Sequence, residues 1–428
     1  MTGAMRFALR FAAVVCVCLL SGPVFAGGPL YVAGTRFPSA VQGKPLVWDS
    51  SSSVRYRTPS SGGLGKMDNA AATARVQKLF QIWQDVPTAK ISYQNAGPIL
   101  ATGAYSSGPV DSKRRFDAVA NSCENGTQSP IIFDAAGGLF AALGLDPAVI
   151  GFAGACDFDG NGHITAALVA LNGIWIDGKQ ANGELSDSQF DEAFTHEFGH
   201  FSGLDHSQIN VSVLLQPQDH CDTALMAALP VMFPFAQCQA RVDAGLPPLS
   251  PDDQAWISFL YPETANNPSA NQVPFDSVYG VVSGKVLFAD GQDMVQGANL
   301  TAQNDGQPQA LQFTVVSGYL FTGDPGQSIT GDNQGDGGLG SHDPSLIGSY
   351  ELPVKAGSYT ITAGSISPFF AGGSSVGPLF FFPIPLPGGG ANQHSALSVA
   401  AGAHVTGIDF HTNDDPAVFS RFDQFEPQ

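Results

Sequence analysis

The chain has 428 residues, of which 43% are hydrophobic and 13% charged, and it contains 50 glycines and 30 prolines. This composition excludes a disordered chain and favours strands and long loops, arranged in two or three domains of ordinary size. The formal net charge of −19 excludes nucleic acid as a favoured partner, because phosphate groups would repel the protein.

The segment 1–26 has the pattern of a secretory signal peptide. Arg6 and Arg10 precede an apolar run at 11–20, and Ala26 ends a stretch of the kind that a signal peptidase cuts. We therefore expect a mature chain that begins near Gly27 and is secreted, either to the extracellular space or to a periplasm. No later stretch is apolar for long enough to cross a membrane, so no integral membrane segment is expected.

Four cysteines follow the signal segment, at Cys123, Cys156, Cys221 and Cys238. An even number in a chain that enters an oxidising compartment predicts two disulfides. Three pairings are possible. We favour Cys123 with Cys156 and Cys221 with Cys238, because the members of each pair are close in sequence.

An N-terminal segment at 27–44 leads into a first domain, which we place at 45–262. In this domain, apolar residues recur at the i, i+3, i+4 and i+7 spacing of a helix at 71–83, which should pack against a sheet. The strands expected in this sheet are short and lie at 53–57, 90–93, 130–133 and 164–171.

Two further helices have clear start signals. Ser186 is followed three residues later by Gln189, which is the capping-box pattern and predicts a helix that runs through Phe201. Ser250, followed by proline, suits the N-cap of another helix, which extends through Leu260. The first domain is therefore expected to be α+β, with three main helices.

After the third helix the pattern changes to a polar, proline-containing linker at 263–277. The rest of the chain has β-branched residues between glycine-bounded turns, which is typical of an all-β sandwich. We place this sandwich at 278–415 and a C-terminal tail at 416–428. The strands expected in the sandwich lie at 282–288, 297–304, 357–364 and 404–412.

The stretch HEFGHFSGLDH at 196–206 has the spacing of a metal site. Each residue of a helix advances about 100°, so His196 and His200 lie about 40° apart on one face and can bind the same ion. The phenylalanines of the same helix fall nearly opposite these histidines and predict a buried face. A set of surface histidines on an amphipathic helix is the alternative, and the fixed spacing argues against it.

A third ligand must return from outside the helix, because two ligands on one helix cannot complete a tetrahedral site. Gly203 can adopt the left-handed conformation that ends a helix, and His206 can then reach the same ion. Three neutral nitrogens leave one position for water, and zinc lowers the pKa of such a water to about 7. Glu197 lies next to the first ligand and could take the proton, so the predicted chemistry is attack of zinc-bound water on a carbonyl.

This stretch resembles the signature HExxHxxGxxH of the metzincin zinc endopeptidases. Within that clan it looks most like the matrixins, whose third histidine is commonly followed by serine, as Ser207 follows here. The resemblance implies a twisted mixed sheet with three main helices, one catalytic zinc held by the three histidines, and Glu197 as the general base. It also implies a methionine-containing turn beneath the metal, which we expect at Met226, with ordinary core packing of this residue as the alternative.

By similarity, a protein or peptide substrate would add as a strand along an edge of the sheet, which we expect at 167–173. Met232, Phe233 and Pro234 would help to wall the pocket for the residue after the cleaved bond, and we expect an apolar residue there. The chain departs from the family in a longer gap between the third histidine and the expected methionine turn. It also lacks the spaced histidines of the family's second, structural zinc.

The sequence DFDGNG at 157–162 matches the opening of a calcium loop, with Asp157, Asp159 and Asn161 as alternating oxygen ligands. The glutamate that such a loop needs at its twelfth position is missing, because Leu168 stands there. A calcium site is therefore one interpretation, and a polar turn before a strand is the other.

The C-terminal region resembles the carboxypeptidase regulatory-like, transthyretin-like sandwich in the glycine-rich cadence of VSGKVLFADGQDMVQGANLTAQN and GSYELPVKAGSYTITA. The complete sequence thus predicts a secreted zinc-dependent endopeptidase. The alternative is a secreted protein whose sandwich attaches to a matrix or cell surface, with the zinc domain minor or inactive, and the intact Glu197 argues against it. The sequence carries no signal for an oligomeric state.

Overall fold

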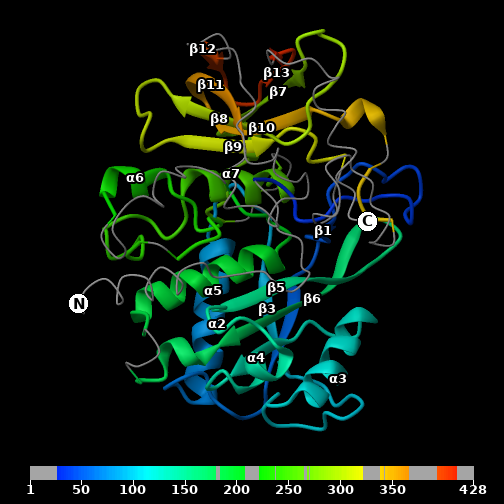
Figure 1. Ribbon diagram of the computed structural model, residues 1–428, viewed down its shortest axis with the longest axis vertical. Coiled ribbons are helices and arrows are strands. Elements are labelled where there is room, and N and C mark those ends of the chain that lie inside the picture. Colours follow the sequence, from blue (N-terminus) through cyan, green and yellow to red (C-terminus); the bar gives the residue numbers. More distant parts are fainter. Residues whose placement is uncertain are drawn as a thin grey trace, which may run out of the picture.

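The protein has a mixed α/β fold with several sheets and few helices (Figure 1). The predicted signal peptide and C-terminal tail lie outside the residues that the structure describes, and no described helix is long and apolar enough to cross a membrane. The computed structural model describes residues 27–179, 184–207, 221–236, 238–264, 268, 270–321, 338–341, 343–365 and 393–411.

The sheet of the N-terminal half is built around one buried strand, β6. β5 pairs with β6 in an antiparallel hairpin, whereas β1 and β4 pair with β6 in parallel on its other side. β2 and β3 form a parallel pair, and a bridge between Arg57 and Pro130 links β2 to the chain that enters β4. The strands are β1 (Val47–Trp48), β2 (Val54–Thr58), β3 (Tyr93–Pro98), β4 (Ile131–Asp134), β5 (Gly151–Phe158) and β6 (His163–Asn172).

Two expectations for this sheet are wrong. The segment 167–173 was expected at the edge, but residues 167–172 belong to β6, which has neighbours on both sides, and the antiparallel β5 forms the edge. Its nearly continuous apolar run suits a central strand buried on both faces. The strand expected at 90–93 begins only at Tyr93, because the chain just before it pairs with the segment after the third main helix, through Ala89 and Pro262.

The three predicted main helices are present as α2 (Asn69–Gln84), α5 (Asp187–Phe201) and α7 (Pro251–Leu260). Both predicted capping interactions form, at Ser186 with Gln189 and at Ser250 with Asp253. Three further helices were not predicted, because none shows a long apolar periodicity: α3 (Lys113–Glu124), α4 (Gly138–Leu143) and α6 (Thr223–Ala228). Single 3₁₀ turns lie at Gly173–Ile176, Phe275–Ser277 and Pro344–Leu346.

Aromatic contacts fix α5 against α2. The rings of Phe80 and Phe198 stack with centroids 3.9 Å apart, and the Trp83 indole donates a hydrogen bond of 2.9 Å to the carbonyl of Thr195. Phe190, Phe194, Phe198 and Phe201 are all fully buried, so the apolar face expected on this helix is confirmed. The opposite side of α5 is therefore the side that is left for the histidines.

The C-terminal half contains two four-stranded sheets. In the first, β7 (Tyr279–Leu287) pairs with β10 (Ser349–Lys355), β13 (His404–Val405) and β14 (Phe410–His411). The second has the order β12 (Gln393–Val399), β11 (Gly357–Ser365), β8 (Ala298–Asn304) and β9 (Gln312–Val316). The expected strand at 404–412 is divided into β13 and β14, and β9, β10 and β12 were not among the strands expected there.

The C-terminal sheets pack directly on α7, which lies below β9 and β10 in Figure 1. The Trp256 indole donates a hydrogen bond of 2.8 Å to the carbonyl of Thr314, and the Thr314 amide donates one of 2.9 Å to the carboxylate of Asp252. Asp252 also accepts a 2.7 Å hydrogen bond from the hydroxyl of Ser207, next to the third histidine. The two halves therefore share a buried polar connection that reaches the candidate metal site.

Both favoured disulfides are confirmed, Cys123 with Cys156 and Cys221 with Cys238. The first joins α3 to the edge strand β5, and the second joins the chain before α6 to the chain that follows Pro234.

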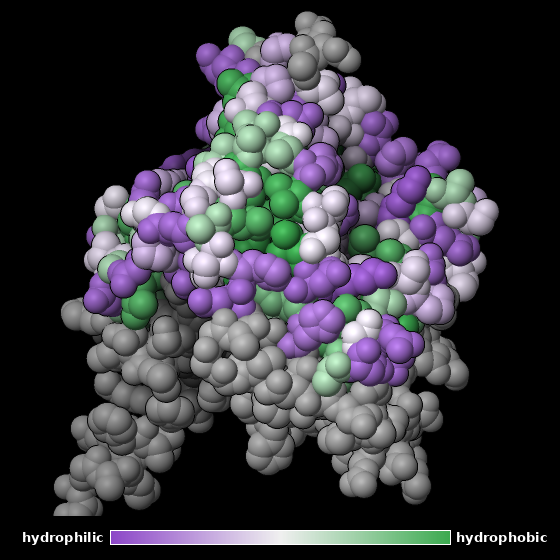
Figure 2. Space-filling model, turned by 90° about the horizontal axis from the view of Figure 1, so that it is seen from above, coloured by the Kyte–Doolittle hydropathy of each residue, from purple (hydrophilic) through white to green (hydrophobic). Residues whose placement is uncertain are grey.

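The end of the molecule formed by the C-terminal sheets shows an apolar area bordered by hydrophilic residues (Figure 2). The large apolar side chains that are exposed among the described residues are Leu100, Val242 and Val273, and none lies on a strand of these sheets.

Asp252 predicts a specific pH dependence of stability. Burial raises the pKa of Asp252 from 3.8 to about 8. Between these values the folded protein holds this proton more tightly than the unfolded chain, so the free energy of unfolding should fall as the pH rises from about 5 to about 8. Asp252→Asn should flatten this fall, as measured by urea unfolding of the chelator-treated proteins. Equal slopes for the two proteins would contradict the prediction.

Candidate metal centre

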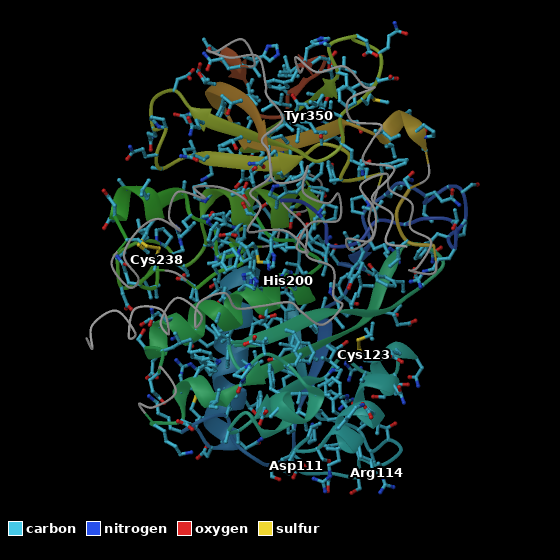
Figure 3. All side chains as sticks on the ribbon, viewed as in Figure 1. Asp111, Arg114, Cys123, His200, Cys238 and Tyr350 are labelled. Carbon is cyan, nitrogen blue, oxygen red and sulfur yellow. A yellow bond between two sulfur atoms is a disulfide. The ribbon has the colours of Figure 1, made fainter. Side chains whose placement is uncertain are left out.

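Three imidazoles meet between α5 and the loop that follows it. The Nε2 atom of His206 lies 3.0 Å from the Nε2 atom of His196 and 3.0 Å from that of His200. Figure 3 shows His200, which belongs to α5, near the middle of the molecule and below the C-terminal sheets. Among the described residues, this is the one group of three or more histidine, cysteine or acidic side chains that could hold a metal ion.

Hydrogen bonds orient the two helical histidines. The Nδ1 atom of His196 lies 2.7 Å from the carbonyl of Val231, and that of His200 lies 2.8 Å from the carbonyl of Leu204. Because a carbonyl only accepts, each Nδ1 must carry the proton, and each Nε2 presents a lone pair to the centre. This arrangement of a ligand nitrogen and an outer hydrogen bond is typical of metal-binding histidines.

The three histidines are neutral near pH 7. Burial lowers the pKa of His196 to about 4 and that of His200 to about 3, and it lowers the pKa of His206 well below its usual value. One proton could bridge a single pair of Nε2 atoms, whereas a cation would satisfy all three lone pairs. The residues present therefore fit a metal ion with nitrogen ligands.

Gly203 ends the helix as the sequence predicts. Its φ of 85° lies in the left-handed region, and the amide of Leu204 then donates a hydrogen bond of 2.9 Å to the carbonyl of Gly199. This turn redirects the chain so that His206 faces the two helical histidines.

The N-terminal segment holds the same loop in place, which the sequence did not indicate. The amide of Leu30 donates to the carbonyl of Gly203 over 2.7 Å, and the amide of Asp205 donates to the carbonyl of Gly28 over 3.1 Å. Gly27 donates a further hydrogen bond to the carbonyl of His206. Residues 27–34 are buried, so the loop is covered on this side by chain rather than by solvent.

Glu197 is a buried carboxylate beside the histidines. It is 6% exposed, and its Oε2 atom has no hydrogen-bond partner among the described residues. A Cβ atom on Gly151 would lie 2.9 Å from the Cγ atom of Glu197, so the glycine at the start of β5 leaves room for this side chain. Burial raises the pKa of Glu197 to about 8. A cation at the histidines would lower this pKa, because it would stabilise the charged carboxylate.

The structure places Met226 and Met232 in different surroundings. Met226 lies in α6 and is buried in a small separate cluster with Leu229, Phe233 and the disulfide of Cys238. Met232 packs instead against the ligand helix, where a Cβ atom on Gly199 would overlap its sulfur. Gly199, between the two helical histidines, is the sequence signal for this close approach, because a larger residue there would meet Met232.

A pocket opens beside His196 and Glu197. It lies between α5 and the segment 229–238, and the start of β5 also contributes to its lining. Phe233 and Pro234 line this pocket as expected, whereas Met232 does not, because its side chain is buried against α5.

The predicted calcium loop forms the turn between β5 and β6. Asp159 accepts hydrogen bonds of 2.8 Å from the amides of Asn161 and His163, whereas Asp157 accepts one from the hydroxyl of Thr165. The two carboxylates therefore serve different partners and do not join a group of metal-binding side chains among the described residues. The polar turn, which was the alternative interpretation, accounts for these contacts.

Comparisons of the chain with protein-family models, with curated proteins and with solved structures found no match.

Replacing a single histidine should remove most of the metal affinity. His206→Ala should bind a divalent transition metal at least about 100-fold more weakly, because two nitrogens on one helix remain. Competition with a coloured chelator measures this affinity. The matched control is His163→Ala, whose side chain lies in the β5–β6 turn and should leave binding unchanged. Unchanged affinity in His206→Ala would exclude this metal site.

The close approach at Gly199 predicts a packing defect. Gly199→Ala should lower the free energy of unfolding by about 1–3 kcal/mol, because the added carbon meets Met232 and lies 3.0 Å from the ring of Trp83. Gly138→Ala in α4 is the control, since a Cβ atom there meets no atom within 4 Å. Chemical denaturation of both variants checks the difference, and equal stability would show that this contact is loose.

Proposed function

We propose that this protein is a secreted, zinc-dependent endopeptidase of the metzincin type. The observation that carries the proposal is the convergence of three neutral imidazole nitrogens next to a buried carboxylate that lines a pocket. Zinc is the metal that best suits three neutral nitrogen ligands with one position left for water or substrate. His196, His200 and His206 would hold it.

Zinc bound at this site would supply a Lewis acid that lowers the pKa of water to about 7. The protein's own residues would provide the rest. Glu197 is placed to accept a proton from the attacking water and to return it to the leaving amine, because its Oε2 atom has no partner among the described residues. The carbonyls of Val231 and Leu204 would keep the two helical imidazoles in the correct tautomer throughout.

The edge strand β5 suits a peptide substrate. It is antiparallel to β6, it lies next to α5, and its first residue, Gly151, lines the pocket together with Ile150. A peptide in extended form could add its main-chain hydrogen bonds along this strand, with one side chain in the pocket. The edge strand is β5 and not the expected segment 167–173. This strand supports the proposed substrate class of proteins or peptides.

Other features support the metzincin-type fold within this proposal. The sheet is mixed, its antiparallel strand lies at the edge, and the three main helices are those that the resemblance implies. The role of the apolar methionine, which the resemblance gave to Met226, is better filled by Met232 because this side chain packs on the ligand helix. Two disulfides are compatible with an extracellular protein.

Glu197→Gln tests the mechanism directly. The variant should bind zinc as well as the unchanged protein and should cleave peptides at least about 1000-fold more slowly, because the amide cannot accept the proton. Cleavage of a proteome-derived peptide mixture, with and without chelator, followed by mass spectrometry provides the measurement.

The exposed Glu124→Gln is a matched control for this experiment and should cleave normally. Metal-loaded Glu197→Gln with the activity of the unchanged protein would exclude Glu197 as the base. Absence of chelator-sensitive cleavage in the unchanged, metal-loaded protein would exclude the endopeptidase itself.

A further inference from the structure

The pocket beside the histidines contains one acidic side chain besides Glu197. Glu192 lies on α5 one turn before His196, and it lines the same pocket. The facing wall is largely apolar and includes Leu229, Pro230 and Phe233. Burying a charged carboxylate beside such a wall costs free energy unless a hydrogen-bond donor or a cation pairs with it. The contacts of Glu192 therefore decide which side chains the pocket can accept.

Glu192 uses only part of its hydrogen-bonding capacity within the protein. Its Oε2 atom accepts a hydrogen bond of 2.7 Å from the main-chain amide of Arg241. Its Oε1 atom has no hydrogen-bond partner among the described residues, although the residue lines the pocket.

The nearby guanidinium of Arg241 does not neutralise Glu192 by direct contact. Its Nη1 atom donates to the carbonyls of Met226 and Leu229, at 2.6 and 2.5 Å, and its Nε atom donates to that of Pro247 at 3.0 Å. No ion pair of Glu192 occurs in the part of the chain that the structure describes. The arginine thus organises the pocket wall and leaves the carboxylate facing the pocket.

The other polar side chain of the pocket, Gln189, is already engaged. Its amide nitrogen donates to the carbonyl of Cys238 at 3.1 Å, and its amide oxygen accepts from the amide of Ser186 at 3.1 Å. Besides Glu197, Glu192 is therefore the group among the described lining residues whose carboxylate has an oxygen left to accept from a bound side chain.

We infer that this pocket selects a basic residue, arginine or lysine, immediately after the cleaved peptide bond. This inference rests on the proposed endopeptidase function and replaces the earlier expectation of an apolar residue. The long carbon stem of either side chain would pack against the apolar wall, and its cationic end would meet the carboxylate of Glu192. A neutral side chain of the same length would leave the carboxylate without a partner, and the protein should discriminate against it.

Peptides that differ at one position test this inference on the metal-loaded, full mature protein. The residue after the cleaved bond would be arginine, lysine, citrulline or leucine, with the rest of the peptide fixed. We expect kcat/KM to be at least about 10-fold higher for arginine than for citrulline, which has the same shape but no charge. Glu192→Gln should bring this ratio close to one, and Glu192→Asp should retain most of it.

Asp243→Asn is the control for long-range electrostatics. Asp243 is exposed and close enough to influence Glu192, but it does not line the pocket. This variant removes the same charge and should keep the preference for arginine. Thermal unfolding and metal content would show that each variant is folded and loaded.

Two results separate the inference from the function on which it rests. Cleavage with a preference for leucine, unchanged in Glu192→Gln, would overturn the inference and leave the endopeptidase function intact. A loss of the arginine preference in Asp243→Asn equal to that in Glu192→Gln would also overturn it. Failure of the unchanged, metal-loaded protein to cleave any of the peptides, or the proteome-derived mixture, would overturn both.

Discussion

The structure depends on bringing three uncharged imidazole nitrogens into one buried space. The Nε2 atoms of His196 and His200 both face that of His206, and the surrounding chain holds the rings in place. Main-chain carbonyls do this for His196 and His200. His206 is placed by its loop, which has the ligand helix on one side and the N-terminal segment on another. The site is thus formed by α5 with the loop that follows it, the N-terminal segment and the segment that carries Val231.

The C-terminal sheets belong to the same arrangement. Asp252 accepts hydrogen bonds from Ser207, which follows the third histidine, and from Thr314, which lies in β9. The core is continuous through both halves, and α7 contributes to it from between them. A sandwich that served only to attach the protein to a surface would not need these buried contacts. The sandwich is therefore connected, through Asp252, to the loop that carries His206.

Buried acids give the site its electrostatic character. Glu192 and Glu197 lie on the same helix and line the same pocket, and burial raises the pKa of both, to about 7 and about 8. Neither carboxylate forms an ion pair among the described residues, so a cation bound beside it would stabilise its charged form. A metal ion would provide this charge for Glu197, and a basic substrate side chain would provide it for Glu192. The lack of an ion-pair partner at these two buried carboxylates therefore links the proposed chemistry to the inferred selectivity.

The sequence by itself determined the features that depend on local chemistry. The three main helices, two capping interactions, both disulfides and the grouping of the three histidines follow from short-range spacing and appear in the structure. Helix periodicity fixes the angle between His196 and His200, and the conformational freedom of Gly203 permits the return of His206. These constraints act within about ten residues, so a single sequence can show them.

Only the tertiary structure decided which distant segments meet at this site. Met232 rather than Met226 packs on the ligand helix, β5 rather than β6 forms the edge, and the N-terminal segment covers the ligand loop. The order of the strands, and which of two nearby methionines packs on the ligand helix, depend on long-range packing. Local propensity and periodicity do not report such packing. The absence of an ion pair at Glu192 among the described residues is a property of the same kind, because the guanidinium of Arg241 donates to the carbonyls of Met226, Leu229 and Pro247 instead.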